Sequence, residues 1–175
     1  FPSYGDELPE FSVPDPLTGE EISTAQFEGE RAVLWTSFYT NCPDGVCPAL
    51  ILRLRRVQAA AADPTGENPD YPIIPPRIRD LLGKAAYSDE VALLPLTFDP
   101  QRDTAEALRE YAAQQGVHLN AGNWHFLRPK TYERAQQIHD EHFGLQIEKQ
   151  PADDTEDLAY RFPHYGLILL ANKQG

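Results

Sequence analysis

Two cysteines, Cys42 and Cys47, are the residues of this chain whose type and spacing most clearly allow chemistry. Both lie in the segment Asn41-Cys42-Pro43-Asp44-Gly45-Val46-Cys47-Pro48. A thiolate attacks disulfides and binds soft metal ions. Two thiols so close in sequence can also form a disulfide if their Cα atoms approach within about 7 Å. The pair predicts a redox or soft-metal site, and the alternatives are two inert cysteines or a fixed structural disulfide.

A metal site built from two cysteines needs a further ligand, and histidine is the most plausible residue type. The chain has five histidines: His118, His125, His139, His142 and His164. His164 directly precedes the last predicted strand, so it can approach the cysteine turn from a neighbouring strand. Two thiolates and an imidazole suit copper in either oxidation state better than calcium or magnesium. Because the chain contains no methionine, a blue-copper site with a methionine ligand is excluded.

The remaining candidates give weaker signals. His139 and His142 are spaced i,i+3 on a predicted helix, which would allow a zinc or copper pair, but we interpret them as part of a solvated helix end. His118 and His125 belong to no motif. Asp44 could tune the two thiols, although a carboxylate in a turn is common.

The cysteine turn lies between a predicted strand and a predicted helix. Residues 31–39 are mostly apolar and β-favouring, as in a buried strand, and residues 48–62 have apolar side chains at helical spacing. The positive end of a helix dipole favours a thiolate. Further predicted elements are strands at 91–98, 123–127 and 166–171, helices at 77–84, 104–115 and 131–143, and a hairpin of residues 10–13 and 21–23.

Strands that alternate with helices predict an α/β fold with a parallel or mixed sheet covered on both faces. In such sheets ligands bind beyond the carboxyl ends of the strands, which is where the cysteine turn lies. The length of 175 residues predicts one domain spanning 1–175. A proline-rich stretch at 63–90 and an acidic stretch at 145–162 are predicted to be insertions.

Composition restricts the partners. Asp and Glu number 27 against 15 Lys and Arg, a net charge of −12, which disfavours nucleic acid and anionic lipid. Only four of the basic residues are lysines, and an acidic, lysine-poor surface suggests a halophilic protein. No apolar run reaches about 18 residues, as a membrane span requires. Because Phe1 is not a natural start, we expect that a signal or anchor segment was removed or that the chain was trimmed.

Three sequence features occur together in a characteristic order. They are Thr36-Ser37-Phe38-Tyr39-Thr40-Asn41-Cys42-Pro43-Asp44 followed by Val46-Cys47-Pro48, then Thr97-Phe98-Asp99-Pro100-Gln101-Arg102-Asp103-Thr104, and finally His164 before an Ile-Leu-Leu strand. In this combination the chain resembles the Sco/SenC family. These are thioredoxin-like proteins associated with copper delivery and redox maintenance during cytochrome c oxidase assembly.

The resemblance implies a fold and a site. The fold would be a thioredoxin-like three-layer α/β/α sandwich with an N-terminal β-hairpin extension and loop insertions. Because the family fold continues past the final turn, we expect a C-terminus that has been shortened. Cys42, Cys47 and His164 would bind one copper ion, as Cu(I) or Cu(II), and Cys42 and Cys47 would form a reversible disulfide. Asp44, Asp99 and Arg102 would support the site, with no catalytic residue beyond the cysteines.

The same resemblance implies an extracytoplasmic protein, membrane-anchored through a segment outside this chain. Its partner would be a membrane oxidase subunit or another copper or thiol protein, and no small-molecule substrate is indicated. The family places three residues between its cysteines, whereas this chain has four, and Gly45 is the apparent insertion. The resemblance implies a copper chaperone rather than an enzyme.

Two other functions remain open. The first is a thiol–disulfide oxidoreductase that uses no metal, in which His164 would have no obvious role. The second is a binding module whose cysteine site has decayed, with Gly45 as the sign of that decay.

Overall fold

The computed structural model describes residues 5–63, 87–151, 160–162 and 166–174. Its strands are β1 (Ser12–Pro14), β2 (Glu21–Ser23), β3 (Ala32–Phe38), β4 (Val91–Thr97), β5 (Gln150–Pro151), β6 (Tyr160–Arg161) and β7 (Ile168–Ala171). Its α-helices are α1 (Val46–Ala62), α3 (Ala105–Gln115) and α4 (Tyr132–Phe143), and its short 3-10 helices are η1 (Thr24–Phe27), η2 (Ser88–Glu90) and η3 (Leu119–Ala121). The predicted helix at 77–84, most of the stretch at 63–90 and residues 152–159 lie outside the described residues.

A three-stranded mixed sheet in the order β4-β3-β7 forms the centre of the molecule. β3 and β4 run parallel, with Ala32 opposite Val91 and Phe38 opposite Thr97, so their carboxyl ends lie side by side. β7 pairs antiparallel with β3. The short predicted hairpin is confirmed as β1 paired with β2.

The strand predicted at 123–127 is wrong in extent. This segment runs beside β4 but forms only two isolated parallel bridges, Leu93 with Trp124 and Leu96 with Leu127. Pro95 explains part of the interruption, because proline has no N–H to donate. The Pro95 carbonyl still accepts a hydrogen bond from the Leu127 amide at 2.9 Å, so the segment covers the edge of β4 without forming a regular strand.

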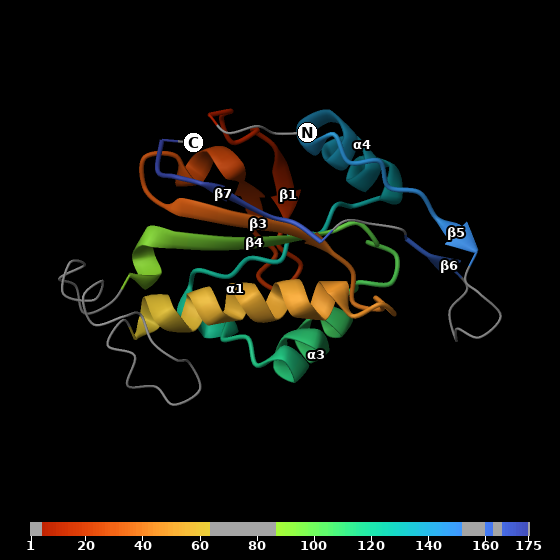
Figure 1. The fold of residues 1–175 in the computed structure, drawn as a ribbon, viewed down its shortest axis with the longest axis horizontal. Coiled ribbons are helices and arrows are strands. Elements are labelled where there is room, and N and C mark those ends of the chain that lie inside the picture. Colours follow the sequence, from red (N-terminus) through yellow and green to blue (C-terminus); the bar gives the residue numbers. More distant parts are fainter. Residues whose placement is uncertain (1–4, 64–86, 152–159, 163–165, 175) are drawn as a thin grey trace.

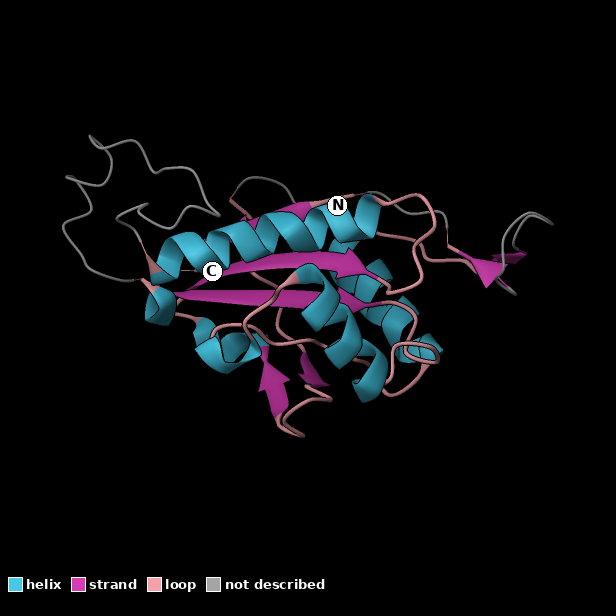
Figure 2. Ribbon diagram, turned by 90° about the horizontal axis from the view of Figure 1, so that it is seen from below, coloured by secondary structure: helices cyan, strands magenta, loops and turns pink. Residues whose placement is uncertain are grey.

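Helices cover both faces of the sheet. Figure 1 shows α1 and α3 on one side and α4 on the other, and Figure 2 shows the β1–β2 hairpin on the side away from α1. The apolar residues separate accordingly. One buried cluster contains Phe38, Ile51, Leu54, Leu93 and Leu108 under α1 and α3, and the other contains Phe11, Trp35, Leu94, Ile138 and Phe143 under the hairpin and α4. The predicted layering of helices on both faces is therefore confirmed.

The helix boundaries follow capping chemistry. Thr104 and Thr131 accept hydrogen bonds from the first turns of α3 and α4, and Gly116 and Gly144 end these helices in the left-handed conformation. α1 begins at Val46, two residues before the predicted start, after Gly45 with a φ of 76°. Cys47 consequently lies in the first turn of α1 rather than in the preceding loop.

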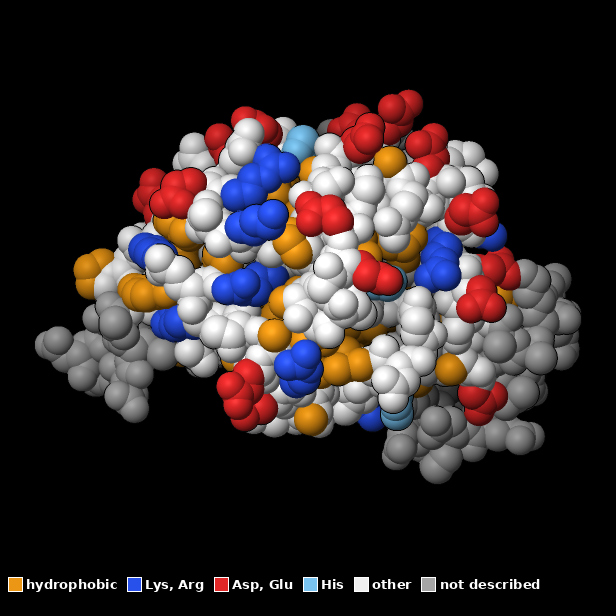
Figure 3. Space-filling view, turned by 180° about the vertical axis from the view of Figure 1, so that it is seen from behind, with side chains coloured by type: hydrophobic (Ala, Val, Ile, Leu, Met, Phe, Trp, Pro, Cys, Tyr) orange, Lys and Arg blue, Asp and Glu red, His pale blue; other side chains and the backbone are white. Residues whose placement is uncertain are grey.

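Charged side chains are unevenly spread. On the face shown in Figure 3, lysine and arginine side chains gather over one part of the surface, with acidic side chains around them. Among the described residues, no helix is long and apolar enough to cross a membrane.

The interpretation of His139 as part of a solvated helix end is wrong. Its side chain is fully buried against Trp35, Phe98 and Phe143, and its Nδ1 lies 2.7 Å from the Ala135 carbonyl. This carbonyl can only accept, so Nδ1 carries the proton of a neutral ring. Burial lowers the pKa of His139 from 6.5 to about 4, while the hydrogen bond to Ala135 opposes this effect. A neutral core histidine with this bond is no metal ligand at Nδ1.

We predict that His139→Phe flattens the acid side of the stability profile relative to the wild type. The unfolded histidine binds a proton below its usual pKa of 6.5, whereas the folded one stays neutral down to about 4. This difference contributes about 3 kcal/mol of stability that is present above pH 6.5 and lost toward pH 4. Urea unfolding between pH 4 and 7.5 measures it.

The stability of the variant must be compared with that of the wild type, because Asp103 makes the free energy of unfolding change with pH in the opposite direction to His139. Burial raises the pKa of Asp103 from 3.8 to about 6, so its contribution is present below pH 3.8 and lost as the pH rises through 6. Subtracting the His139→Phe curve from that of the wild type removes this shared effect. The exposed His118, replaced by asparagine, is the control. Parallel wild-type and His139→Phe curves would contradict the prediction.

Candidate functional site

The loop between β3 and α1 places Cys42 at the N-terminus of α1. The Cys42 sulfur accepts a hydrogen bond from the Cys47 amide at 3.3 Å, and its thiol donates to Oδ1 of Asp44 at 2.9 Å. The same carboxylate oxygen accepts the Val46 amide at 3.0 Å. Asp44 therefore shapes the turn and is also the immediate proton acceptor for the Cys42 thiol.

Cys47 differs from Cys42 in its surroundings. Cys42 is partly exposed, whereas Cys47 is fully buried, and the two cysteines do not form a disulfide. Burial raises the pKa of the Cys47 thiol, and a hydrogen bond with Cys42 adds to this effect. The two thiols thus contact each other, with one accessible from solvent and the other enclosed behind it. This is the arrangement of an attacking cysteine and a resolving cysteine, and it is also suited to sharing a soft metal ion.

Two buried tyrosines surround the thiols. The pKa of Tyr39 is raised by burial first and then by the negative charges that Cys42 and Cys47 would carry, while a hydrogen bond with the Phe162 backbone opposes this. Burial and the same two cysteines raise the pKa of Tyr111. Both phenols therefore stay neutral at physiological pH. Tyr39 and Tyr111 are uncharged, buried side chains of the same cluster as Cys47, on the α1 side of the sheet.

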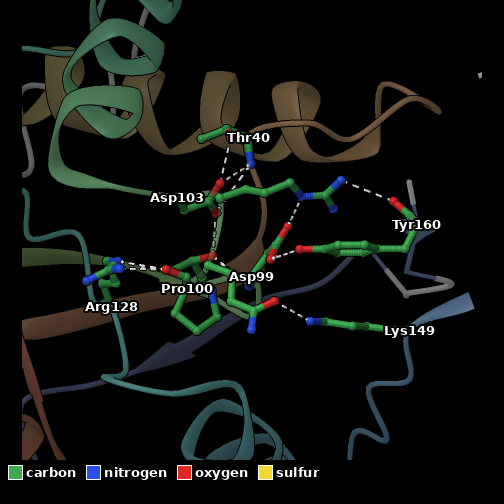
Figure 4. A network of polar contacts seen from close by, with 10 residues as sticks. Thr40, Asp99, Pro100, Asp103, Arg128, Lys149 and Tyr160 are labelled. Atoms are coloured by element: carbon green, nitrogen blue, oxygen red, sulfur yellow. Dashed lines mark hydrogen bonds and ion pairs between the residues drawn. The ribbon is translucent and has the colours of Figure 1, made fainter. Parts of the chain in front are cut away.

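A buried carboxylate fixes the start of the cysteine loop. Asp103 is fully buried and accepts hydrogen bonds from the Thr40 hydroxyl at 2.6 Å, from the Thr40 amide at 3.1 Å and from the Thr97 hydroxyl. Thr40 follows β3, and Thr97 is the last residue of β4. Asp103 therefore joins the carboxyl ends of the two parallel strands, and Thr40 lies two residues before Cys42 (Figure 4).

Asp99 and Arg102 form a second polar group at the same edge. Asp99 is fully buried, pairs with the Arg102 guanidinium and accepts the Tyr160 hydroxyl at 2.9 Å. Arg102 also donates to the Tyr160 carbonyl at 3.1 Å, and its guanidinium carbon lies 3.8 Å from the centre of the Tyr160 ring. Asp99 and Arg102 thus belong to one network in the turn after β4, whereas Asp44 lies beside Cys42 (Figure 4).

His164 lies outside the described residues, but the residues on either side of its segment are placed. Phe162 packs edge-on against Tyr39, with ring centroids 5.4 Å apart. Gly166 approaches α1 so closely that a Cβ atom there would lie 2.6 Å from Cγ1 of Val46. Within the described residues, no group of three or more histidine, cysteine or acidic residues could hold a metal ion.

Sequence reasoning missed several residues of this site. Asp103 stands directly before the helix predicted at 104–115, and nothing local distinguishes a buried carboxylate there from a turn residue. Tyr39 and Tyr160 were not singled out, because their roles depend on partners far away in the sequence. The only available signal was the position of Tyr39 and Asp103 inside the two motif segments.

Comparison with known proteins identifies the family. A family model described as SCO1/SenC matches residues 76–175, more than half of the chain. The protein belongs to the SCO1/SenC family. A search among curated proteins found no match.

Solved structures of SCO1/SenC proteins establish the fold. ScoI of Bradyrhizobium japonicum with copper bound is 20% identical with a TM-score of 0.64, covering 95% of this chain and 83% of its own. A SCO1/SenC family lipoprotein of Bacillus anthracis is 18% identical with a TM-score of 0.65, covering 97% and 80%. BsSco, described with a disulfide switch and as a member of the Sco family of cytochrome c oxidase assembly proteins, is 19% identical with a TM-score of 0.57, covering 82% and 67%. The predicted thioredoxin-like α/β fold is confirmed.

We predict that the two cysteines differ strongly in reactivity. At pH 8 the Cys47→Ser variant, which keeps Cys42, should react with iodoacetamide roughly tenfold or more faster than the Cys42→Ser variant. The reason is that Cys47 is buried and its pKa is raised. Mass spectrometry of the alkylated protein gives both rates, and denatured samples should show equal ones. Equal rates in the folded variants would contradict the geometry of the site.

We also predict that Gly166→Ala destabilises the protein by about 1–3 kcal/mol, because the new methyl group overlaps the stiff Val46 side chain. Val46→Ala makes room for that methyl group. The double variant should therefore be more stable than the sum of the two single effects predicts. Urea unfolding measures this coupling, and strictly additive losses would show that Gly166 and Val46 do not meet.

Proposed function

We propose that the protein binds one copper ion through Cys42, Cys47 and His164 and passes it to a membrane oxidase subunit, or uses the same cysteines to keep that subunit's thiols reduced. The observation that carries the proposal is the contact between the two thiols at the carboxyl end of β3, beside the residues that flank His164. Family membership supports this function, since ScoI of Bradyrhizobium japonicum was solved with copper bound.

The donor set fits copper as cargo. Two thiolates suit Cu(I), and an added imidazole suits Cu(II). The two thiols contact each other although four residues separate them, and Gly45 with a φ of 76° is where we propose the extra residue is accommodated. Binding must release the proton of the buried Cys47 thiol, so apparent affinity should rise with pH. Transfer would exchange each copper–sulfur bond for one to a partner thiolate, and the cysteines would regain their protons.

The copper would be exchanged outside the cytoplasm, in a protein anchored to a membrane. A structurally similar SCO1/SenC protein is a lipoprotein, which supports this proposal. The net charge of −12 favours a partner with a positively charged docking surface.

Metal-free thiol–disulfide exchange is the second candidate, and the contact between an exposed and a buried thiol favours it. Cys42, deprotonated, would attack a partner disulfide, form a mixed disulfide and release one partner thiolate. Cys47, deprotonated in turn, would attack the Cys42 sulfur and release the second partner thiolate. The partner gains two electrons and the two protons, while Cys42 and Cys47 become a disulfide. The disulfide switch described for BsSco supports this chemistry.

We predict that the reduced protein, mixed in high salt with one equivalent of Cu(II), shows intense thiolate-to-copper absorption bands. Cys42→Ser, Cys47→Ser and His164→Ala should each abolish or strongly shift the bands, because each removes one donor. His118→Ala, which changes an exposed histidine, should leave them intact.

Two outcomes would contradict copper binding at this site. Bands that survive in both Cys42→Ser and His164→Ala would place the metal elsewhere. Rapid oxidation to a Cys42–Cys47 disulfide without retained copper would favour the oxidoreductase.

A further inference from the structure

Tyr160 is held at three points by the end of β4. Its hydroxyl donates to Asp99 at 2.9 Å, its carbonyl accepts from Arg102 at 3.1 Å, and its ring lies 3.8 Å from the guanidinium carbon of Arg102. Burial and the hydrogen bond with Asp99 raise the pKa of Tyr160 to about 12, so the hydroxyl keeps its proton and remains a donor. A planar guanidinium is needed for this arrangement, because one fork bonds the Asp99 carboxylate and the Tyr160 carbonyl while its face covers the ring.

This cluster also reaches the end of β3. The Arg102 guanidinium lies 5.8 Å from the ring centre of Tyr39, which precedes Cys42 by three residues. Phe162 contacts Tyr39, Phe98 and Tyr160, with ring centroids 5.4, 5.1 and 5.6 Å apart. Residues 160–162 are therefore fixed against the ends of β3 and β4, and the cysteine loop follows β3.

The local structure of residues 160–162 is too small to fix their position alone. β5 and β6 form a separate two-stranded sheet with only two residue pairs, Gln150 with Arg161 and Pro151 with Tyr160. Figure 1 shows this pair at the periphery, beyond the carboxyl ends of β3 and β4. An isolated two-stranded ribbon is marginal in water. The contacts of Tyr160 with Asp99 and Arg102, together with the packing of buried Phe162, therefore hold these residues in place.

Lys149 adds to this restraint from the β5 side. Its ammonium group lies 4.5 Å from the ring centres of both Tyr132 and Tyr160 and donates to the Gln101 side chain at 2.6 Å. Two cations thus contact the Tyr160 ring, Arg102 from the turn after β4 and Lys149 from the residue before β5.

We propose that Arg102 and Tyr160 are positioning residues that clamp residues 160–162 and so set where His164, two residues farther along the chain, meets the cysteine pair. The clamp consists of Asp99, Arg102 and Tyr160. The proposal rests on the proposed function, because it gives the clamp its effect through His164 as a copper ligand. It explains why a partly buried ion pair lies on a turn that contains no cysteine or histidine.

The test compares Arg102→Lys, which keeps the charge but loses the planar fork, with Arg128→Lys as a matched control. Arg128 donates two hydrogen bonds, at 3.1 and 2.6 Å, to the Pro100 carbonyl, and Figure 4 shows it on the side of the turn away from Tyr160. Tyr160→Phe removes only the hydroxyl that bonds Asp99. Cu(I) and Cu(II) affinities are measured for each variant with His164 present and with His164→Ala.

Arg102→Lys should weaken Cu(II) binding about tenfold, the usual loss on removing support for a metal ligand, and leave Cu(I) binding nearly unchanged. Cu(I) is satisfied by two thiolates, whereas Cu(II) depends on the imidazole. In the His164→Ala background Arg102→Lys should cause no further loss. Tyr160→Phe should act in the same direction, and Arg128→Lys should match the wild type. Equal losses of Cu(I) and Cu(II) affinity, or a loss that adds to that of His164→Ala, would overturn the proposal.

Amide hydrogen exchange of the metal-free protein separates the clamp from the copper site. Arg102→Lys should speed exchange in a peptide spanning residues 160–168, while Arg128→Lys should not. Unchanged exchange would overturn the clamp whatever the copper data show. If His164→Ala leaves copper affinity unchanged, the proposed function fails and the role of the clamp in copper binding fails with it. In that case faster exchange would still identify Arg102 as the residue that holds the segment.

Discussion

The hydrogen bonds that converge on the buried carboxylate of Asp103 connect the sheet to its site. Thr40 comes from the end of β3 and Thr97 from the end of β4, and Asp103 accepts hydrogen bonds from both. Parallel pairing brings these strand ends together, but it leaves the backbone beyond them without ladder partners. Asp103 bonds Thr40, the second residue of the loop that carries Cys42 from β3 to α1, so the position of Cys42 depends on it.

This arrangement has an energetic cost. Burial raises the pKa of Asp103 to about 6, although its three hydrogen bonds lower it. At neutral pH the protein therefore keeps an ionised carboxylate in a place where a neutral side chain would be more stable. His139, in the layer on the other face of the sheet, avoids this cost because it stays neutral against Trp35 and Phe143. The ionised carboxylate of Asp103, which is costly to bury, lies near the cysteine loop, and the neutral imidazole of His139 lies in the core.

The sequence was sufficient to predict the elements whose determinants are local. The buried strand before Cys42, the three described α-helices and the N-terminal hairpin follow from apolar spacing, threonine caps and glycine stops. The approach of the two thiols was expected from a short spacing at a helix start. The earlier start of α1 was not predicted, because Gly45 was interpreted only as an inserted residue and not as the left-handed residue before the helix.

Non-local contacts could not be predicted in the same way. The segment at 123–127 has the composition of a strand, but only the path of β4 with Pro95 decides that it forms isolated bridges. His139 has polar neighbours in sequence and aromatic neighbours in space. Tyr160 donates a hydrogen bond to Asp99, which lies 61 residues earlier in the sequence, and no pattern within either segment predicts that contact. Family resemblance located the motif segments, and the structure shows which atoms within them interact.

X-ray absorption at the copper edge, recorded on the protein loaded with one equivalent of Cu(II), tests the central claim most directly. The account predicts a first coordination shell with two sulfur atoms and an imidazole nitrogen, and it predicts loss of the imidazole signal in His164→Ala with both sulfur atoms retained. A shell without sulfur, or an imidazole signal that survives in His164→Ala, would contradict it.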